Sequence, residues 1–378
     1  MPHHRLVRVF VAAIAAALLL SHGTAALAAT TDCPLRDAPF SVDAPLLDVL
    51  LSPAAHAIVD REAPTLLNPL PPHLQKRDAP AFAAILTLRM MARSKALDLA
   101  RLDAALRAAP VTRADTIARC ARYDEDPLPT LPAPGRPALL IFQKINGFRD
   151  GPSVAAGEQA LRDIAARNGW NVVVTDRGGA MTAATLRHFD AVVWNNVSGD
   201  VLTLRQRAAF RTYVEHGGGF VGIHGAGGDL AYFWDWYADT LLGARFKAHP
   251  TNPSFQDARV VVDRAANAIT RGLAPSWTMN DEWYSFAASP RATGANVLLT
   301  LDETSYAPIG AGADIGMGDH PIAWTRCLGD GRAFYSAIGH RPETYADANN
   351  RRFLEQAITW AAKRGATQCR RGREIPAR

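Results

Sequence analysis

Histidines and carboxylates are the residue types in this sequence that could perform acid-base chemistry, and four histidines stand at promising places. His224 follows the apolar run GGGFVGI and precedes GAGG. A glycine-flanked residue at the end of a buried strand is lifted above the sheet edge and surrounded by backbone N–H groups. His249, His320 and His340 stand at strand ends or on loops. We expect the four imidazoles to converge on one crevice.

Two carboxylates stand beside two aromatic residues in the segment NDEWYSF, residues 280–286. Histidine and carboxylate together can supply a general acid and base near neutral pH, or the ligands of a divalent metal ion. The candidate catalytic residues are His224, His340, Asp281 and Glu282.

Metal binding is the more specific of the two interpretations of this site. The candidate ligands are His224, His249 and His340, but the sequence has no HExxH motif or other fixed helical spacing of ligands. The sequence therefore names no certain cofactor and leaves a divalent metal open.

A small carbohydrate is the ligand that these residue types favour, because carboxylates accept hydrogen bonds from hydroxyls and aromatic faces cover C–H patches. The candidate binding residues are Phe148, Arg149, Asn195, Asn196, His249, Trp283, Tyr284 and His320. Structural roles stay open for them: a histidine can bond the backbone of a tight turn, aromatic residues can pack in a core, and asparagines can cap turns.

An alternation of strands and helices must position these residues. Apolar, strand-like runs lie at 138–143, 171–176, 191–196 and 219–224. Amphipathic segments at 152–169 and 202–217 separate them. This pattern predicts an α/β fold with a doubly wound, mostly parallel sheet, whose site lies beyond the carboxyl ends of the strands. Later elements are expected as strands at 259–263, 296–302, 321–327 and 331–339, and a closing helix at 350–365.

The chain divides into five parts by composition. Residues 1–28 are typical of a secretory signal peptide, with basic residues, an apolar run and a small-residue cleavage signal. Residues 32–123 are rich in helical patterns and predict a small N-terminal helical module, with helix starts at Ser52 and Thr112. Residues 124–137 hold five prolines and are interpreted as a linker. The α/β domain then covers 138–365, and a solvated basic tail covers 366–378.

The signal peptide predicts a secreted or periplasmic protein. No later stretch approaches the roughly 20 apolar residues of a membrane-spanning helix, so we expect no membrane anchor. An even number of cysteines in an oxidising compartment favours two disulfides. Pairing within each module joins Cys33 to Cys120 and Cys327 to Cys369.

The formal net charge of +5 does not indicate a nucleic-acid partner, because arginines crowd the C-terminal tail and no DNA-reading motif accompanies them. We expect a small carbohydrate as the partner. The sequence leaves homo-oligomerisation open.

Six motifs in a fixed order resemble the ThuA-like (trehalose utilisation) family over about residues 138–363. They are KINGFRD (144–150), GGGFVGIHGAGG (217–228), FWDWYADTLLGARFKAHP (233–250), NDEWYSF (280–286), HPIAW (320–324) and GRAFYSAIGH (331–340). The resemblance implies a flavodoxin-like or class I glutamine amidotransferase-like fold and an association with trehalose or keto-sugar metabolism.

Two departures argue against glutamine hydrolysis. His224 stands where an amidotransferase would hold its nucleophilic cysteine, and Glu343 lies three residues after His340 instead of two. In addition, Asp150 replaces the histidine of the GFRH that related sequences often show. The favoured function is binding of a carbohydrate or keto-sugar, with transformation by acid-base or metal-assisted chemistry if the protein is an enzyme. The alternative is a non-catalytic carbohydrate-binding or scaffold protein.

Overall fold

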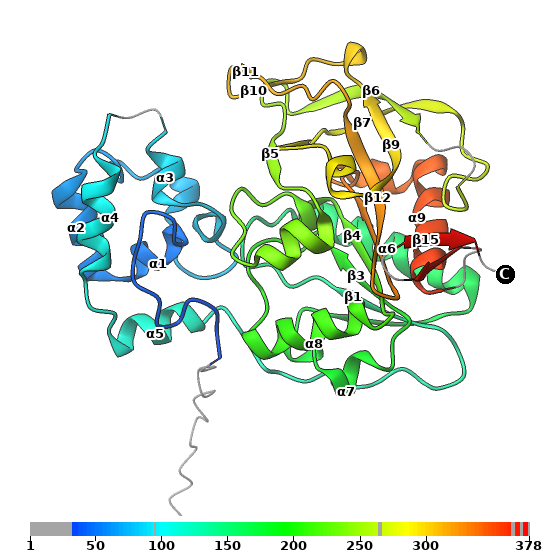
Figure 1. Cartoon of the computed structure of the whole chain (residues 1–378), viewed down its shortest axis with the longest axis horizontal. Helices are drawn as coiled ribbons and strands as arrows, with labels where there is room; N and C mark the ends of the chain where they lie inside the picture. Colours follow the sequence, from blue (N-terminus) through cyan, green and yellow to red (C-terminus); the bar gives the residue numbers. More distant parts are fainter. Residues whose placement is uncertain (1–31, 94–95, 264–266, 364–366, 371–372, 377–378) are drawn as a thin grey trace, which may run out of the picture.

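The computed structural model describes residues 32–93, 96–263, 267–363, 367–370 and 373–376. The predicted signal peptide lies outside the described residues. Figure 1 shows a helical module beside a larger α/β domain. None of the helices in the described part of the chain is long and apolar enough to cross a membrane.

The helical module is built from short helices around its own apolar core. Its elements are α1 (Leu46–Leu51), α2 (Pro53–Glu62), α3 (Leu88–Met91), α4 (Leu99–Arg107), α5 (Arg113–Cys120) and single 3-10 turns at Pro72–Leu74 and Phe82–Ile85. The Ser52 hydroxyl caps α2, and Thr112 caps α5 in a capping box with Asp115. Both helix starts are therefore where the sequence predicted them.

The central sheet has the strand order β2-β1-β3-β4-β13-β12-β9-β6-β7. Its parallel part comprises β2 (Asn171–Thr175), β1 (Ala138–Phe142), β3 (Ala191–Asn195), β4 (Gly219–Ile223) and β13 (Gly331–Ser336). Its antiparallel part comprises β12 (Pro321–Leu328), β9 (Asn296–Asp302), β6 (Phe255–Val262) and β7 (Ser276–Glu282). The predicted α/β class is confirmed, with antiparallel strands added at one side.

Helices cover both faces of the parallel strands, as the doubly wound prediction requires. Figure 1 shows α7 (Ala183–Leu186) and α8 (Leu204–Glu215) on one side of the sheet. The other side carries α6 (Gly151–Asn168) and α9 (Ala348–Ala361), which an ion pair between Arg167 and Glu355 joins. The continuous apolar strands β1, β3 and β4 are buried throughout because both faces are covered.

Smaller elements surround the sheet. The short strand pairs are β5 (Phe246–Ala248) with β8 (Ser285–Phe286), β10 (Ile309–Gly310) with β11 (Ala313–Asp314), and β14 (Thr367–Arg370) with β15 (Arg373–Pro376). A π-helix covers Trp236–Leu242, and 3-10 turns cover Gly178–Ala180, His224–Gly227, Pro290–Thr293, Glu303–Ser305 and Pro342–Tyr345.

Two disulfides close the fold, and both pair as predicted. Cys33 joins Cys120 within the helical module, and Cys327 joins Cys369. The described residues of the predicted C-terminal tail form the β14–β15 hairpin, which Cys369 ties to β12. The proline-rich segment 124–137 contains neither helix nor strand. Asp124 anchors its start by accepting a hydrogen bond from Lys144 at 2.6 Å.

Candidate functional site

His224 occupies the turn that ends β4. The residue is 4 % exposed and has a φ of +43°, a left-handed conformation that non-glycine residues rarely adopt and that concentrates at functional sites. Its Nδ1 lies 2.7 Å from the carbonyl oxygen of Ala337. Because a carbonyl oxygen only accepts, Nδ1 carries a hydrogen, and Nε2 points the other way. Nε2 lies 2.8 Å from the Tyr284 hydroxyl oxygen, within hydrogen-bonding distance.

Two of the backbone N–H groups that were expected to face a ligand at His224 are engaged within the protein. The N–H of Gly225 donates to Oδ1 of Asn196, and the N–H of Gly228 donates to the carbonyl oxygen of Gly225. The turn thus consumes these donors internally. What it presents to a ligand is the imidazole of His224.

Glu282, at the end of β7, joins three histidines. Its Oε2 lies 2.8 Å from His340 Nδ1 and 3.6 Å from His224 Nε2. Its Oε1 lies 3.2 Å from His249 Nδ1. Burial by itself raises the pKa of Glu282, but hydrogen bonds and positive charge from His224 and His340 hold the pKa well below its usual range. Glu282 is therefore a carboxylate at neutral pH.

Asp281 positions the loop that carries His340. Its carboxylate is fully buried and accepts hydrogen bonds from the N–H groups of Gly339, His340 and Arg341 at 2.7, 3.1 and 3.0 Å. Gly339 has a φ of +137°, and a Cβ there would lie 2.6 Å from the Tyr345 hydroxyl, so this bend requires glycine. Burial raises the pKa of Asp281, although the charge of His224 and the N–H bonds oppose it. The sequence predicted a catalytic residue here, and the geometry gives Asp281 a positioning role.

His340 lies between carboxylates. Its Nδ1 bonds Glu282, and its Nε2 is 3.7 Å from Oδ2 of Asp150, the residue that caps α6. Burial by itself lowers the pKa of His340, but the hydrogen bond and charge of Glu282, with Asp281 and Asp150, leave the pKa above its ordinary value. This imidazole can therefore act as a proton donor near neutral pH.

His224, Glu282 and His340 also have the geometry of a metal-binding group. One nitrogen of each histidine and one carboxylate oxygen all lie within 4.8 Å of one another. Bonds of about 2.0–2.2 Å to a tetrahedral ion would place ligand atoms about 3.4 Å apart, close to the observed 2.8 and 3.6 Å. The bond from His224 Nδ1 to Ala337 is the outer-shell contact that orients metal-binding histidines.

A cavity of about 370 Å³ opens above this group. Its walls include Glu282, Tyr284, His249 and His340 from the α/β domain and Phe82, Ile85 and Arg93 from the helical module. Phe148 lines both this cavity and a smaller hollow over His224. Its ring is 48 % exposed and its centroid lies 6.0 Å from that of His340. The site is thus shared between the two modules.

The trehalose utilisation family model, ThuA, matches residues 138–361, more than half of the chain. The chain belongs to the ThuA family. The match begins at β1, so the helical module lies outside it. The fold, the elbow at His224 and the Asp281–Glu282 strand are all parts of the ThuA domain.

Two solved structures are among those similar to this chain. A crystal structure of a ThuA-like protein from Bacteroides uniformis covers 62 % of this chain and 95 % of its own, with 26 % identity and a TM-score of 0.51. Another ThuA-like protein, from Parabacteroides merdae, covers 60 % of this chain and 90 % of its own, with 17 % identity and a TM-score of 0.45. No curated protein matches the sequence.

Several predicted binding residues of the ThuA domain do line the two hollows, namely Phe148, Asn196, His249 and Tyr284. The structure gives four others different surroundings. Asn195 is fully buried and donates to Gln143 and to the carbonyl oxygen of Val154. Arg149 lines a separate cavity beside the helical module. These two predictions are corrected: Asn195 is structural, and Arg149 lines the separate cavity and neither of the two hollows.

Trp283 and His320 are also corrected to structural residues. Trp283 is fully buried, and its indole N–H donates to the Gln256 carbonyl oxygen, so it offers a sugar no ring face. His320 is 1 % exposed, and its two ring nitrogens contact Glu303 at 2.7 Å and the carbonyl oxygen of Tyr284 at 2.9 Å. Neither lines the cavity.

Sequence reasoning left out residues that flank His340. Asp150 was noted only as a departure from the family pattern, yet it lies beside the His340 ring. Phe255 at the start of β6 is 40 % exposed, and its ring centroid is 5.0 Å from that of His340. No signal in the sequence near residue 255 points to this contact, because it depends on tertiary packing.

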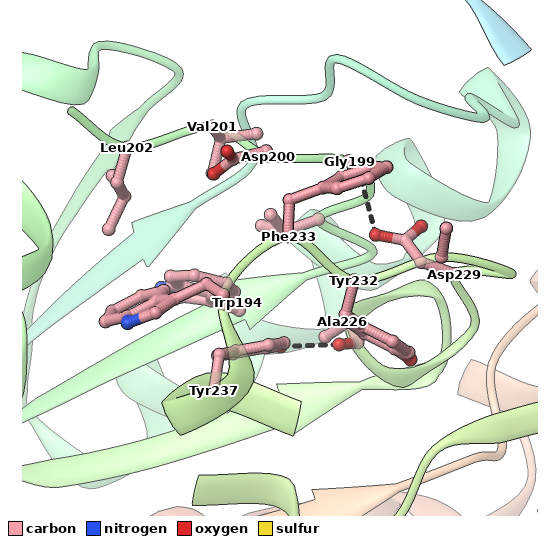
Figure 2. A pocket seen from close by; sticks show the side chains of 13 residues that line it. Trp194, Gly199, Asp200, Val201, Leu202, Ala226, Asp229, Tyr232, Phe233 and Tyr237 are labelled. Carbon is pink, nitrogen blue, oxygen red and sulfur yellow. Dashed lines mark hydrogen bonds between the residues drawn. The ribbon is translucent and has the colours of Figure 1, made fainter. Parts of the chain in front are cut away.

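A buried carboxylate supports the wall of the smaller hollow. Asp229 accepts hydrogen bonds from the Ser198 hydroxyl at 2.6 Å and from the Gly199 N–H at 2.7 Å. Figure 2 shows a separate pocket, lined by Trp194 and Tyr237 among others, in which the Asp229 carboxylate points at Gly199. Burial raises the pKa of Asp229 to about 7. Asp229 therefore holds Ser198, a lining residue, in place.

Proposed function

We propose that this ThuA-family protein binds a carbohydrate or keto-sugar in the cavity above Glu282 and transforms it there. The observation that carries the proposal is the convergence of His224, Glu282 and His340, of which Glu282 and His340 line the cavity with aromatic rings and His224 lines the smaller hollow beside it. The volume of about 370 Å³ lies within the usual range for small-molecule sites, about 300–1,000 Å³.

Exposed aromatic rings favour a saccharide as the ligand. Phe148 and Phe255 flank His340 and are 48 % and 40 % exposed, although phenylalanine is usually buried. Such rings cover the C–H face of a sugar, and the carboxylate of Glu282 and the imidazoles hydrogen-bond its hydroxyls. The carbohydrate class is supported by the description of the family, trehalose utilisation.

A divalent metal ion fits the ligand set of two imidazoles and one carboxylate. When bound, such an ion would act as a Lewis acid on a substrate oxygen or water. His224, Glu282 and His340 would hold it, and Ala337 would orient His224 through Nδ1. Tyr284 would yield its bond to Nε2 of His224.

A metal-free acid-base site is the second candidate, and the 2.8 Å contact between His340 and Glu282 favours it. His340, with its raised pKa, would donate a proton to a leaving oxygen. The Glu282 carboxylate would stabilise the imidazolium. His224, aligned by its bond to the Ala337 carbonyl oxygen, would accept a proton through Nε2.

The protein works outside the cytoplasm in this proposal. Two disulfides fit an oxidising compartment, and the described part of the chain has no helix suited to spanning a membrane. Secretion or periplasmic residence follows from the predicted signal peptide.

The test compares turnover and binding in the purified mature protein against monosaccharides, disaccharides and their keto derivatives. Glu282→Gln and His340→Ala should abolish turnover. His216→Ala is the matched control, because His216 is exposed on α8 and bonds its own helix at Thr212. Turnover that survives both site changes overturns the proposal. Saccharide binding without turnover in the unaltered protein would instead indicate the non-catalytic carbohydrate-binding alternative.

A further inference from the structure

We propose that the cavity selects an acidic saccharide, and that the helical module supplies both a wall and one of two cations that recognise its negative group. This inference rests on the carbohydrate function proposed above. It adds the charge of the ligand and a role for residues 32–123, which lie outside the ThuA match.

The helical module is docked firmly enough to form part of the site. The N–H of Ala81 donates to the carbonyl oxygen of Asn146 at 2.9 Å. Ile85 packs so closely on Gly147 that a Cβ there would lie 2.6 Å from its side chain. The Phe82 ring meets the Phe148 ring edge-on, with centroids 6.1 Å apart. The wall facing Phe148 therefore belongs to the module.

Two cations line the cavity without a partner. Arg93 follows α3 and Lys247 lies in β5, and both side chains are exposed. Neither forms a side-chain hydrogen bond or ion pair with any residue that the structure describes. Their neighbours behave differently: Arg89 pairs with Asp43, and Arg245 pairs with two aspartates. The described part of the chain thus supplies carboxylate partners to the nearby arginines but none to Arg93 and Lys247, which are available to bind a ligand.

The negative charge in the cavity wall is already engaged. Glu282 contacts three histidines, so it does not neutralise Arg93 or Lys247. A ligand with one anionic group and an apolar ring face would satisfy the rest of the cavity: the ring against Phe148, the anion at the two cations. A carboxylate on the sugar, as in a uronate or aldonate, is the group we infer. A sugar phosphate shares this chemistry and forms a separate arm of the test.

Calorimetric titration of the mature protein with matched ligands tests the inference. The neutral ligands are glucose and cellobiose, and the acidic ones are glucuronate, cellobionate and glucose 6-phosphate. The unaltered protein should bind a carboxylate ligand about fivefold to tenfold more tightly than its neutral counterpart at low salt, and less so as salt is added. Tighter binding of the phosphate than of either carboxylate would overturn the carboxylate assignment.

Variants assign the preference to the two cations. Arg93→Gln and Lys247→Gln should each lower the affinity for the acidic ligand about threefold to fivefold and leave the neutral ligand unchanged. Arg113→Gln, an exposed cation at the start of α5 outside the cavity, is the matched control and should change neither affinity. Equal losses for acidic and neutral ligands, or no loss at all, would overturn the inference. Binding of neutral saccharides without an acidic preference refutes the inference alone, whereas no binding of any saccharide refutes the proposed function.

Discussion

Removing the carboxylate of Asp281 should destabilise the protein by an amount that can be worked out from its contacts. Three N–H groups, on residues 339–341, donate to this fully buried carboxylate. Asp281→Ala leaves three donors without an acceptor, at about 1–3 kcal/mol for each buried group. Gly339 is buried and the two following residues are half-buried, so we expect a loss of about 3–5 kcal/mol in unfolding free energy.

Asp281→Asn should cost much less, because it keeps Oδ1 for His340 and Arg341 and loses only the acceptor for Gly339. We expect a loss of about 1–2 kcal/mol. For a domain of this size each kcal/mol corresponds to about 2–4 °C in melting temperature. Thermal unfolding of both variants, with the exposed Asp78→Ala as control, measures the difference. An Asp281→Ala protein that melts within about 2 °C of the unaltered one, or an Asn variant as unstable as the Ala variant, would refute the reasoning.

Three further predictions concern other parts of the molecule. Burial raises the pKa of Asp229 from 3.8 to about 7. Between these two values the folded chain holds a proton that the unfolded chain releases. The free energy of unfolding should therefore fall as the pH rises from 4 to 7, by at most ~4 kcal/mol. Chemical unfolding across that range should show a flatter profile for Asp229→Asn; equal slopes would count against the burial argument. Replacing Cys33 and Cys120 together by alanine should lower stability by about 2–5 kcal/mol, since the disulfide closes a span of 87 residues, and non-reducing peptide mapping of the unaltered protein must recover this pair. Phe255→Ala should raise KM for a saccharide substrate more than it lowers kcat, because the ring is exposed beside His340 and touches no reacting atom; an unchanged KM would remove Phe255 from the binding surface.

The parallel half of the sheet could be predicted because its strands are continuous apolar runs. Strands β1, β3 and β4 are buried along their whole length, and this environment selects the apolar residues that make them visible in the sequence. The turn at His224 could be predicted for the same reason, because it begins where β4 ends.

Strand β7 was not predicted, although it carries Asp281 and Glu282. It lies at the edge of the sheet, and its run SWTMNDE is mostly polar and only partly buried. Successive side chains of an extended segment point to opposite sides. Glu282 and Tyr284 therefore reach the cavity, whereas Asp281 and Trp283 point into the protein. The prediction from the sequence grouped the four residues as one polar and aromatic patch, because it did not include this strand.

His320 shows a second limit of sequence reasoning. Its partner Glu303 comes from the turn after β9, and its other contact is a backbone carbonyl. Neither partner leaves a signal near residue 320 in the sequence. The share of the site made by the helical module was missed for a similar reason, because the docking of Phe82 on Phe148 depends on tertiary packing alone.

Metal analysis of the mature protein, purified without an affinity tag, decides most directly between the metal site and the metal-free acid-base site at His224, Glu282 and His340. The protein and its Glu282→Gln variant would be stripped with a chelator, incubated with zinc, manganese or iron(II), desalted and measured by elemental analysis. Two imidazoles and a carboxylate within 4.8 Å predict one divalent ion per unaltered chain and none in the variant. No ion in the unaltered protein, or equal occupancy in both, would contradict the metal site at His224, Glu282 and His340.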